Sequence, residues 1–414
     1  MKTIFAAALA LVMFASPVWA DDVALEAKAR AIQSHVITID THTDIPTFFA
    51  SDKYDPGKLN GPPVLVDLPR MKTGGLDAVF FIVYVDQTKR DAAGYAEAAS
   101  EAFAKFAAIH RMVDEQYSKD IGLALTSADI RRIHADGRRI ALIGIENGYA
   151  IGKNPALLDI YYGLGARYFG LTHNGHNDLG DSAQPRADLG DKPNDKGGEH
   201  GGLSAYGREI VARCNDLGIM VDVSHSAKST TLDAIKSSRT PVIASHSAVY
   251  ALNPHPRNMS DEEMLALAKK GGVIQIVAFD EYLHAVSKEK KAARGKLAKS
   301  LGLTSLDAFF AASPATKEKF AKSVAELDRT FPRAGVSDLV DHIDYAVKLI
   351  GIDHVGIASD FQGGGGIEGW ANAGETLNVT KELVKRGYSQ EQIGKLWGGN
   401  LMRVMDEVAA ARKS

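Results

Sequence analysis

The sequence predicts an α/β protein: a single closed (β/α)8 barrel in which eight parallel strands alternate with helices. Two patterns support this prediction. Short, almost continuous apolar runs recur along the chain, as expected of strands buried on both faces, and helix-like segments separate most of them. The length of 414 residues agrees, because such a barrel needs about 250 residues in its simplest form and tolerates insertions.

Eight runs are expected to form the strands. They are rich in Val, Ile, Leu, Phe or Ala, and in chain order they cover residues 36–40, 78–85, 140–145, 168–171, 219–223, 241–244, 272–278 and 354–358. Because each run is nearly continuous in apolar residues and does not alternate with polar ones, both of its faces should be covered, the inner face by the barrel core and the outer face by helices.

Apolar residues recur at helical spacing between these runs and after the last one. Ser260 precedes three acidic residues and is expected to cap a helix that starts at residue 261. Gly218 and Gly351 stand where two further helices should end. The predicted helices cover residues 91–117, 204–217, 229–238, 261–269, 336–350, 375–385 and 389–411.

Two segments exceed what a minimal barrel needs. Residues 178–202, after the fourth predicted strand, are rich in Gly, Asp and Pro and indicate a long loop. Residues 281–333, between the seventh and eighth strands, are rich in Lys, Ala and Ser and indicate an inserted pair of helices. A lid over the barrel and a solvated surface elaboration are both open interpretations of this insertion.

The first twenty residues have the pattern of a secretory signal peptide. Lys2 precedes an apolar run over residues 4–15, and Val18-Trp19-Ala20 predicts a cut after Ala20. The run is too short to span a membrane comfortably, and no cysteine near the cut could carry a lipid anchor. We therefore expect residues 21–414 to be exported without a membrane anchor, to the periplasm in a Gram-negative source and otherwise into the medium.

The charge balance argues against a nucleic-acid-binding protein, and the cysteine content shows that the fold does not depend on an intramolecular disulfide. Lys and Arg number 48 against 51 Asp and Glu, so the chain lacks the basic excess of a typical nucleic-acid-binding protein. The single cysteine, Cys214, cannot form an intramolecular disulfide, so the fold needs none. Cys214 lies on a helix-like stretch, where packing is its expected role.

Candidate metal ligands follow five of the predicted strands. In such barrels the carboxyl ends of the strands carry the chemistry. Imidazole and carboxylate ligands without thiolates favour Zn²⁺ or a similar divalent ion. Three histidines with two or three carboxylates are too many for one four-coordinate zinc, so the set predicts two metal ions that share a carboxylate. The residues are His42, Asp44, Glu146, His225, His246 and Asp360.

Two further histidines leave the fourth strand toward the same rim. Only one of His173 and His176 needs to be catalytic, and His173 is favoured because it lies nearer the strand end. The remaining histidines lie before strands, on helices or in loops, and we expect them to be structural or surface residues.

These motifs resemble the membrane dipeptidases, also called renal dipeptidases, which are zinc peptidases of family M19 on the amidohydrolase-type barrel. The resemblance covers nearly the whole chain after residue 20. Its most specific pieces are the opening His42-Thr43-Asp44 and the block Asp222-Val223-Ser224-His225, which follows a helix ending in Asn-x-Leu-Gly.

The resemblance implies a dipeptidase with two Zn²⁺ ions that hydrolyses free dipeptides. It leaves open whether the carboxyl-terminal residue of the substrate is an L- or a D-residue. The implied metal ligands are His42 and Asp44 for the first zinc, His225 and His246 for the second, and Glu146 as a bridge between them. His173 would bind the developing oxyanion, Arg257 and Tyr282 would bind the substrate carboxylate, and Asp360 would transfer protons.

Two other functions remain open at this stage. One is a related metal-dependent amidohydrolase acting on N-acyl amino acids, β-lactams or lactones; the other is an exported metal- or ligand-binding protein without catalysis. Arg257 favours a substrate with a carboxylate, while His173 and Asp360 favour catalysis over storage. The sequence also leaves open whether the protein is a monomer or a homodimer.

Overall fold

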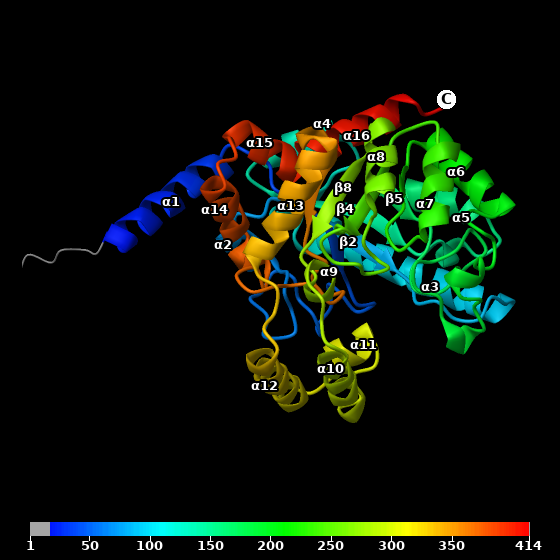
Figure 1. The fold of residues 1–414 in the computed structure, drawn as a ribbon, viewed down its shortest axis with the longest axis horizontal. Coiled ribbons are helices and arrows are strands. Elements are labelled where there is room, and N and C mark those ends of the chain that lie inside the picture. The colour runs from blue at the N-terminus through cyan, green and yellow to red at the C-terminus, as the bar shows by residue number, and fades with distance from the viewer. Residues whose placement is uncertain (1–16, 414) are drawn as a thin grey trace, which may run out of the picture.

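The computed structural model describes residues 17–413 (Figure 1). Most of the predicted signal peptide, residues 1–20, lies outside the described residues. Helix α1 (Pro17–Gln33) begins within its last four positions and packs against α14 (Leu377–Lys385). No helix in the described part of the chain is long and apolar enough to cross a membrane.

Eight parallel strands follow one another around a nearly closed barrel, as predicted. The Asp44 amide donates to the Phe361 carbonyl at 3.0 Å where the first strand meets the end of the last. A ninth strand, β3 (Ile121–Leu123), pairs only with β4 and was not predicted. The barrel order is β1 (Ile39–Asp44), β2 (Ala78–Tyr84), β4 (Arg139–Glu146), β5 (Ala166–Gly170), β6 (Met220–Asp222), β7 (Val242–Ser247), β8 (Val273–Val277) and β9 (Val355–Ala358).

One end of the barrel is filled by apolar side chains. Residues near the start of several strands, among them Ile39, Ala78 and Val273, form one buried cluster with Leu401 and Val408 of helix α16 (Asn400–Ala410). Because α16 packs against the amino ends of the strands, the carboxyl ends face the opposite side and remain available for polar residues.

The predicted helices are present between and after the strands. Ser260 donates through its amide and its hydroxyl to Glu263 at the start of α8, and Gly218 has a left-handed φ of 80° at the end of α6. Short helices α2 (Leu68–Gly74), α4 and α5 were not predicted. The remaining bounds are α3 (Ala92–His110, continued by a π-helical turn, Arg111–Gln116), α4 (Ser127–Ala135), α5 (Ala156–Gly163), α6 (Ala205–Leu217), α7 (Lys228–Ser237), α8 (Asp261–Lys269), α9 (Asp280–Leu283), α13 (Val336–Ile350) and α15 (Gln390–Gly394).

The insertion between the seventh and eighth barrel strands contains three helices, not the predicted pair. They are α10 (Lys288–Ser300), α11 (Leu306–Ala311) and α12 (Pro314–Thr330), and they project together from the barrel (Figure 1). Local signals divide them: Gly302 has a φ of 71° after α10, Ser305 caps α11, and Ser313 caps α12. With only six residues, α11 is too short to show a helical periodicity of its own in the sequence.

Candidate active site

The predicted metal ligands come together at the carboxyl ends of the strands. His42 and Asp44 lie on β1, Glu146 ends β4, His225 follows β6, and His246 lies on β7. All five residues are buried. Residues that are far apart in the sequence therefore share one site because the carboxyl ends of all the barrel strands lie at the same rim.

Glu146 lies between the histidines. Its Oε1 is 3.0 Å from His225 Nε2 and 3.3 Å from His246 Nε2, whereas its Oε2 is 3.5 Å from His42 Nε2. The two carboxylate oxygens thus face different imidazoles, as a carboxylate shared by two metal ions would.

Asp44 and Asp360 form the other side of the site with His42. Ligand atoms of these three residues lie within 4.8 Å of one another. Gly363 lies against the two carboxylates, and a Cβ atom there would collide with an oxygen of each. The glycine run 363–366 thus includes a position where the site excludes a side chain, which the sequence did not reveal.

Hydrogen bonds fix the orientation of two of the predicted histidine ligands. Tyr168 Oη donates to the Thr41 carbonyl at 3.1 Å, so it accepts from His42 Nδ1 at 3.0 Å. Ser245 Oγ donates to Asp222 at 2.6 Å, so it accepts from His246 Nδ1 at 2.8 Å. Because each Nδ1 carries the proton, each Nε2 keeps the lone pair that a metal ion needs.

The third histidine follows the same rule with an amide partner. His225 Nδ1 lies 3.3 Å from Asn174 Oδ1, an acceptor, which again leaves Nε2 free to bind a metal. The backbone of His225 has a φ of 66°. This left-handed conformation is costly for a residue other than glycine and persists only where neighbouring contacts enforce it.

The electrostatics of the site suit a divalent cation. Burial lowers the pKa of His42, but the neighbouring carboxylates, Glu146 foremost, outweigh burial and raise it to about 10. Burial and the Glu146 carboxylate raise the pKa of Asp44 to about 7. His42 Nε2 and Asp44 Oδ1 are also buried without a hydrogen-bond partner. The residues present therefore fit a metal ion, which would supply the positive charge and the missing contacts.

A candidate carboxylate clamp lies beside this cluster. Arg257 is buried and donates to the His246 carbonyl at 3.2 Å, and its Nε has no hydrogen-bond partner. Its guanidinium lies 5.3 Å from the ring centre of Tyr282, which stacks on Phe279. The structure thus brings Arg257 and Tyr282 together, as the resemblance implied.

His173 contacts the ligand set from the fourth barrel strand. Its ring centre is 4.2 Å from that of His225 and 4.6 Å from that of Tyr84, and its Nδ1 has no hydrogen-bond partner. Burial lowers the pKa of His173. A neutral imidazole with an uncommitted nitrogen can donate or accept a hydrogen bond at the reacting centre.

Comparison with known proteins identifies the family. Residues 26–414 match the membrane dipeptidase family, peptidase family M19. The chain belongs to the membrane dipeptidase family. Dipeptidase aclJ of Aspergillus oryzae is 30% identical over 354 residues, which are 84% of this chain and 71% of that protein. Dipeptidase verJ of Clonostachys rogersoniana is 30% identical over 396 residues, 92% of this chain and 86% of that protein.

One solved structure supports the same assignment, and a more distant one shares the fold. The crystal structure of the probable dipeptidase PvdM from Pseudomonas aeruginosa superposes with a TM-score of 0.81 at 32% identity, covering 94% of this chain and 99% of that one. A Rhodobacter sphaeroides metallo peptidase, solved with a phosphinate mimic of L-Ala-D-Ala, shares the fold with a TM-score of 0.69 at 22% identity, over 90% of this chain and 99% of that one. This member of the membrane dipeptidase family is therefore a metallo-dipeptidase, a hydrolase.

Three residues that orient the predicted ligands of this metallo-dipeptidase could not be identified from the sequence. Tyr168, Asn174 and Ser245 contact histidines through space, and for Tyr168 the partner is on another strand. A hydroxyl or amide in a strand or loop carries no signal of this role. Ser245 alone could have been suspected, because it precedes a candidate ligand directly.

Proposed function

We propose that this metallo-dipeptidase is a zinc enzyme with two metal ions that hydrolyses free dipeptides. The observation that carries the proposal is the position of Glu146, with one oxygen toward His42 and the other toward His225 and His246. A single metal ion would leave one of these two groups of donor atoms without a metal ion to bind. Nitrogen and oxygen donors without thiolates suit zinc.

The proposed metal ligands divide into two groups. His42 and Asp44 would hold one ion, His225 and His246 the other, and Glu146 would bridge them. Bound zinc would lower the pKa of a water molecule and polarise a carbonyl group. The carboxylates of this buried set would attract such a cation, since they raise the pKa of His42 to about 10 although burial opposes the charge.

Substrate binding is proposed for Arg257 and Tyr282. The planar guanidinium of Arg257 can bind the free carboxylate of a dipeptide through two parallel hydrogen bonds. Burial of Arg257 strengthens such a contact, because water competes less for the charge. With the carboxylate held here, the peptide bond of a short substrate can reach the cluster around Glu146.

Proton transfer is proposed for Asp360 and hydrogen bonding to the reacting carbonyl for His173. Burial and the neighbouring carboxylates raise the pKa of Asp360 well above its usual range. A carboxylate with this tendency to take up a proton can accept one from the attacking water and pass it to the leaving amine. His173, beside His225, can donate to the oxygen that becomes negative.

Metal analysis combined with a dipeptide panel tests the proposal. The purified protein should contain about two zinc ions per chain and hydrolyse dipeptides, whereas Glu146→Gln should lose activity and retain less metal, because the amide is neutral and a weaker ligand. The panel should contain L-L and L-D pairs and N-acetylated versions. Undiminished zinc and activity in Glu146→Gln would sink the two-metal assignment, and turnover of the N-acetylated compounds alone would favour an N-acyl amidohydrolase.

A carboxylate clamp at Arg257 makes a second, separable prediction. Arg257→Ala should raise KM for free dipeptides by about 10- to 100-fold, the value of a charged hydrogen-bonded contact. The loss should be much smaller for a dipeptide amide, which lacks the carboxylate. Steady-state kinetics on matched dipeptide and amide substrates measure the difference, and equal losses on both would refute the clamp.

Export is proposed on the pattern of residues 1–20 alone. A basic residue, an apolar run and small residues before position 21 are what a signal peptidase requires. Expression of the full chain in a Gram-negative host, followed by fractionation and N-terminal sequencing, tests this. A periplasmic product starting at Asp21 is expected; an intact cytoplasmic chain starting at Met1 would contradict it.

A further inference from the structure

The long loop after the fourth barrel strand, residues 178–202, holds the backbone of two active-site histidines. Ser182 Oγ donates to the His173 carbonyl, and the Ala183 amide donates to the His225 carbonyl at 2.7 Å. Two consecutive residues of the loop thus each fix one histidine carbonyl. For His225 this contact bears on a strained residue, since its φ is 66°.

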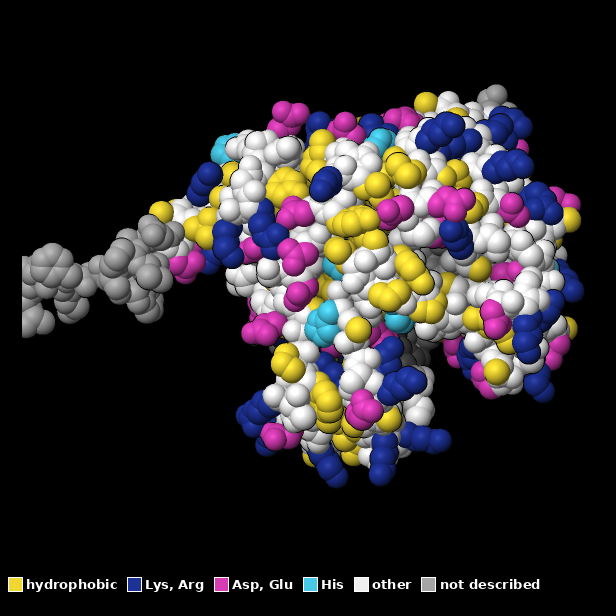
Figure 2. All heavy atoms as spheres, in the orientation of Figure 1, with side chains coloured by type: hydrophobic (Ala, Val, Ile, Leu, Met, Phe, Trp, Pro, Cys, Tyr) yellow, Lys and Arg dark blue, Asp and Glu magenta, His cyan; other side chains and the backbone are white. Residues whose placement is uncertain are grey.

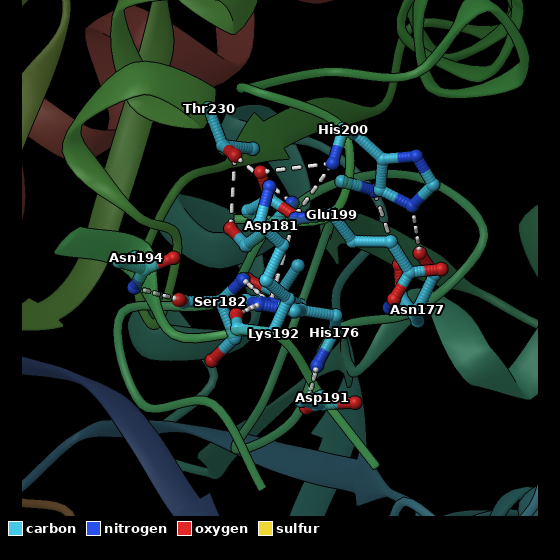
Figure 3. A network of polar contacts seen from close by, with 12 residues as sticks. His176, Asn177, Asp181, Ser182, Asp191, Lys192, Asn194, Glu199, His200 and Thr230 are labelled. Carbon is cyan, nitrogen blue, oxygen red and sulfur yellow. Dashed lines mark hydrogen bonds and ion pairs between the residues drawn. The ribbon is translucent and has the colours of Figure 1, made fainter. Parts of the chain in front are cut away.

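His176 holds this part of the loop in place. Its side chain is fully buried, its Nδ1 accepts from the Ser182 amide at 2.9 Å, and its Nε2 donates to the Lys192 carbonyl at 2.8 Å. Its own amide donates to Asp191 at 2.7 Å. Figure 3 shows Ser182, His176 and Lys192 side by side in this network. The two ring contacts together require a neutral imidazole with its proton on Nε2.

We propose that His176 is a positioning residue of this dipeptidase. Through Ser182 and Ala183 it fixes the backbone positions of His173 and His225. It thereby orients the side chains of the proposed oxyanion donor, His173, and of one proposed metal ligand, His225. This inference rests on the proposed roles of those two histidines. His176 itself touches neither the metal ligands' side chains nor the reacting atoms in any contact we observe.

Other contacts also hold the loop, and one of them reaches Ser182: Asn194 Nδ2 donates to the Ser182 carbonyl at 2.8 Å. Asp181 accepts from the amides of Glu199 and His200, and Thr230 donates to the Asp181 carbonyl at 2.8 Å (Figure 3). His200 Nε2 donates to the Asn177 carbonyl at 2.9 Å. His200 therefore offers a matched control: a histidine bound to a backbone carbonyl of the same network that does not contact Ser182.

Two substitutions of His176 separate its two ring contacts. In His176→Asn the side-chain amide can occupy the place of Nδ1 and keep the Ser182 contact, but it is too short to reach Lys192. In His176→Gln the longer amide can occupy the place of Nε2 and keep the Lys192 contact, while the Ser182 amide loses its acceptor. His200→Asn removes the control contact to Asn177.

The experiment measures zinc content, zinc affinity, kcat, KM and Tm for the full-length enzyme and these three variants. We expect His176→Gln to lose about 10- to 100-fold in kcat and in affinity for one of the two ions, the usual effect of a residue that orients a ligand. KM should change less, because Arg257 is untouched. His176→Asn and His200→Asn should stay near the wild type in kcat and zinc affinity, although each loses one hydrogen bond and its Tm should fall.

Equal losses in His176→Asn and His176→Gln would overturn the inference, as would a His176→Gln enzyme with unchanged kcat and zinc affinity. If His176→Gln does not fold, Ser182→Ala serves instead: it removes the hydroxyl that fixes the His173 carbonyl and should lower kcat at full zinc content, and an unchanged kcat would overturn the inference. A wild-type protein that binds no zinc would refute the proposed function itself. The wild-type zinc content therefore tests the proposed function, whereas the variants test the positioning role.

Discussion

Each histidine that faces Glu146 depends on one partner atom for its tautomer. For His42 that atom is Tyr168 Oη, whose own proton is committed to the Thr41 carbonyl. The hydroxyl adds no charge to the site and is fully buried with its ring. Removing it would therefore leave the packing nearly intact while releasing His42 to adopt the wrong tautomer or rotate.

Tyr168→Phe should lower zinc affinity by about 10- to 100-fold, as loss of a ligand's hydrogen-bond partner commonly does. Competition with a chromogenic chelator measures the affinity of each ion. Tyr161→Phe is the matched control, because Tyr161 is also fully buried and donates to a backbone carbonyl, that of Ala150 at 2.9 Å, but lies on α5 away from the ligands. Equal affinities in the two variants would show that the hydroxyl of Tyr168 does not orient His42.

At the scale of the elements, one buried ion pair holds the helical insertion (α10, α11 and α12) to helix α9 at its base. Lys290 of α10 lies 2.9 Å from Asp280 of α9 and 3.4 Å from Asp328 of α12, and its side chain is 5% exposed. Asp280 also accepts from the Ala334 amide at 2.7 Å, where the insertion returns to the barrel. Both ends of the insertion therefore meet at Asp280.

Lys290→Met should loosen the insertion while leaving the barrel folded. The substitution keeps most of the apolar stem but leaves Asp280 buried without its cation, which costs about 3–5 kcal/mol when the charge cannot reach water. Limited proteolysis should cut residues 288–330 faster than in the wild type. Lys322→Met removes an exposed pair with Glu318 on α12 and should not change the cleavage rate, since such pairs contribute about 1 kcal/mol or less.

A helix-to-barrel contact also predicts a dependence on pH. His342 of α13 accepts from the Val249 amide at 3.0 Å and donates to the Leu283 carbonyl at 2.9 Å. Burial lowers its pKa below the ordinary value. At pH values between the lowered pKa of the folded chain and the ordinary pKa of the unfolded chain, the unfolded chain binds a proton that the folded chain does not. The contribution of His342 to the free energy of unfolding is therefore full above about pH 6.5 and is lost as pH falls.

His342→Gln removes this titration but not the neighbouring groups. The wild type should be more stable than the variant at about pH 7, and the difference should narrow toward about pH 5, because only the wild type loses the His342 contribution. Urea unfolding at a series of pH values measures both free energies. A difference that is constant over this range would contradict the sign of the shift.

The sequence predicted the regular elements better than the irregular ones. All eight barrel strands were found because buried parallel strands are continuous apolar runs, although the first covers Ile39–Asp44 and not residues 36–40, since its second half is polar. By contrast, β3 has only three residues, Ile121–Leu123, and pairs on one side. The division of the insertion into three helices depends on Gly302 and on caps at Ser305 and Ser313, single residues within a polar stretch. Such short features carry too little periodicity to be recognised.

The site shows the same limit. The clustering of His42, Asp44, Glu146, His225 and His246 could be predicted because each lies near or just after the carboxyl end of a strand, and the carboxyl ends of all strands meet. Tyr168 and His176 could not be assigned their roles, since both depend on contacts that only the folded chain creates. The strained backbone of His225 likewise has no sequence signal, because it is imposed by its neighbours.

For the whole molecule, the proposed metal ions would connect strands that are not neighbours. The proposed ligands come from β1, β4, the end of β6 and β7. Bound zinc would therefore link strands on different sides of the barrel opening, in addition to the hydrogen bonds between neighbouring strands. Without zinc, the buried carboxylates of Asp44, Glu146 and Asp360 face one another with no full neutralising charge. Burial and these neighbours raise the pKa of Asp360 well above its usual range, which reflects that repulsion.

Chelation of the metal should therefore lower Tm by about 5–10 °C. A ligand present at about 1,000 times its Kd stabilises the native state by about 4 kcal/mol, and in domains of roughly 200 residues each kcal/mol changes Tm by about 2–4 °C, with smaller changes in longer chains. Calorimetry before chelation, after it and after zinc is restored measures the effect. The Tm of Glu146→Gln, which lacks the bridging carboxylate, should respond much less to chelation. If zinc leaves the wild type and its Tm does not change, the ions do not fasten the barrel, and the cluster at the strand ends serves chemistry alone.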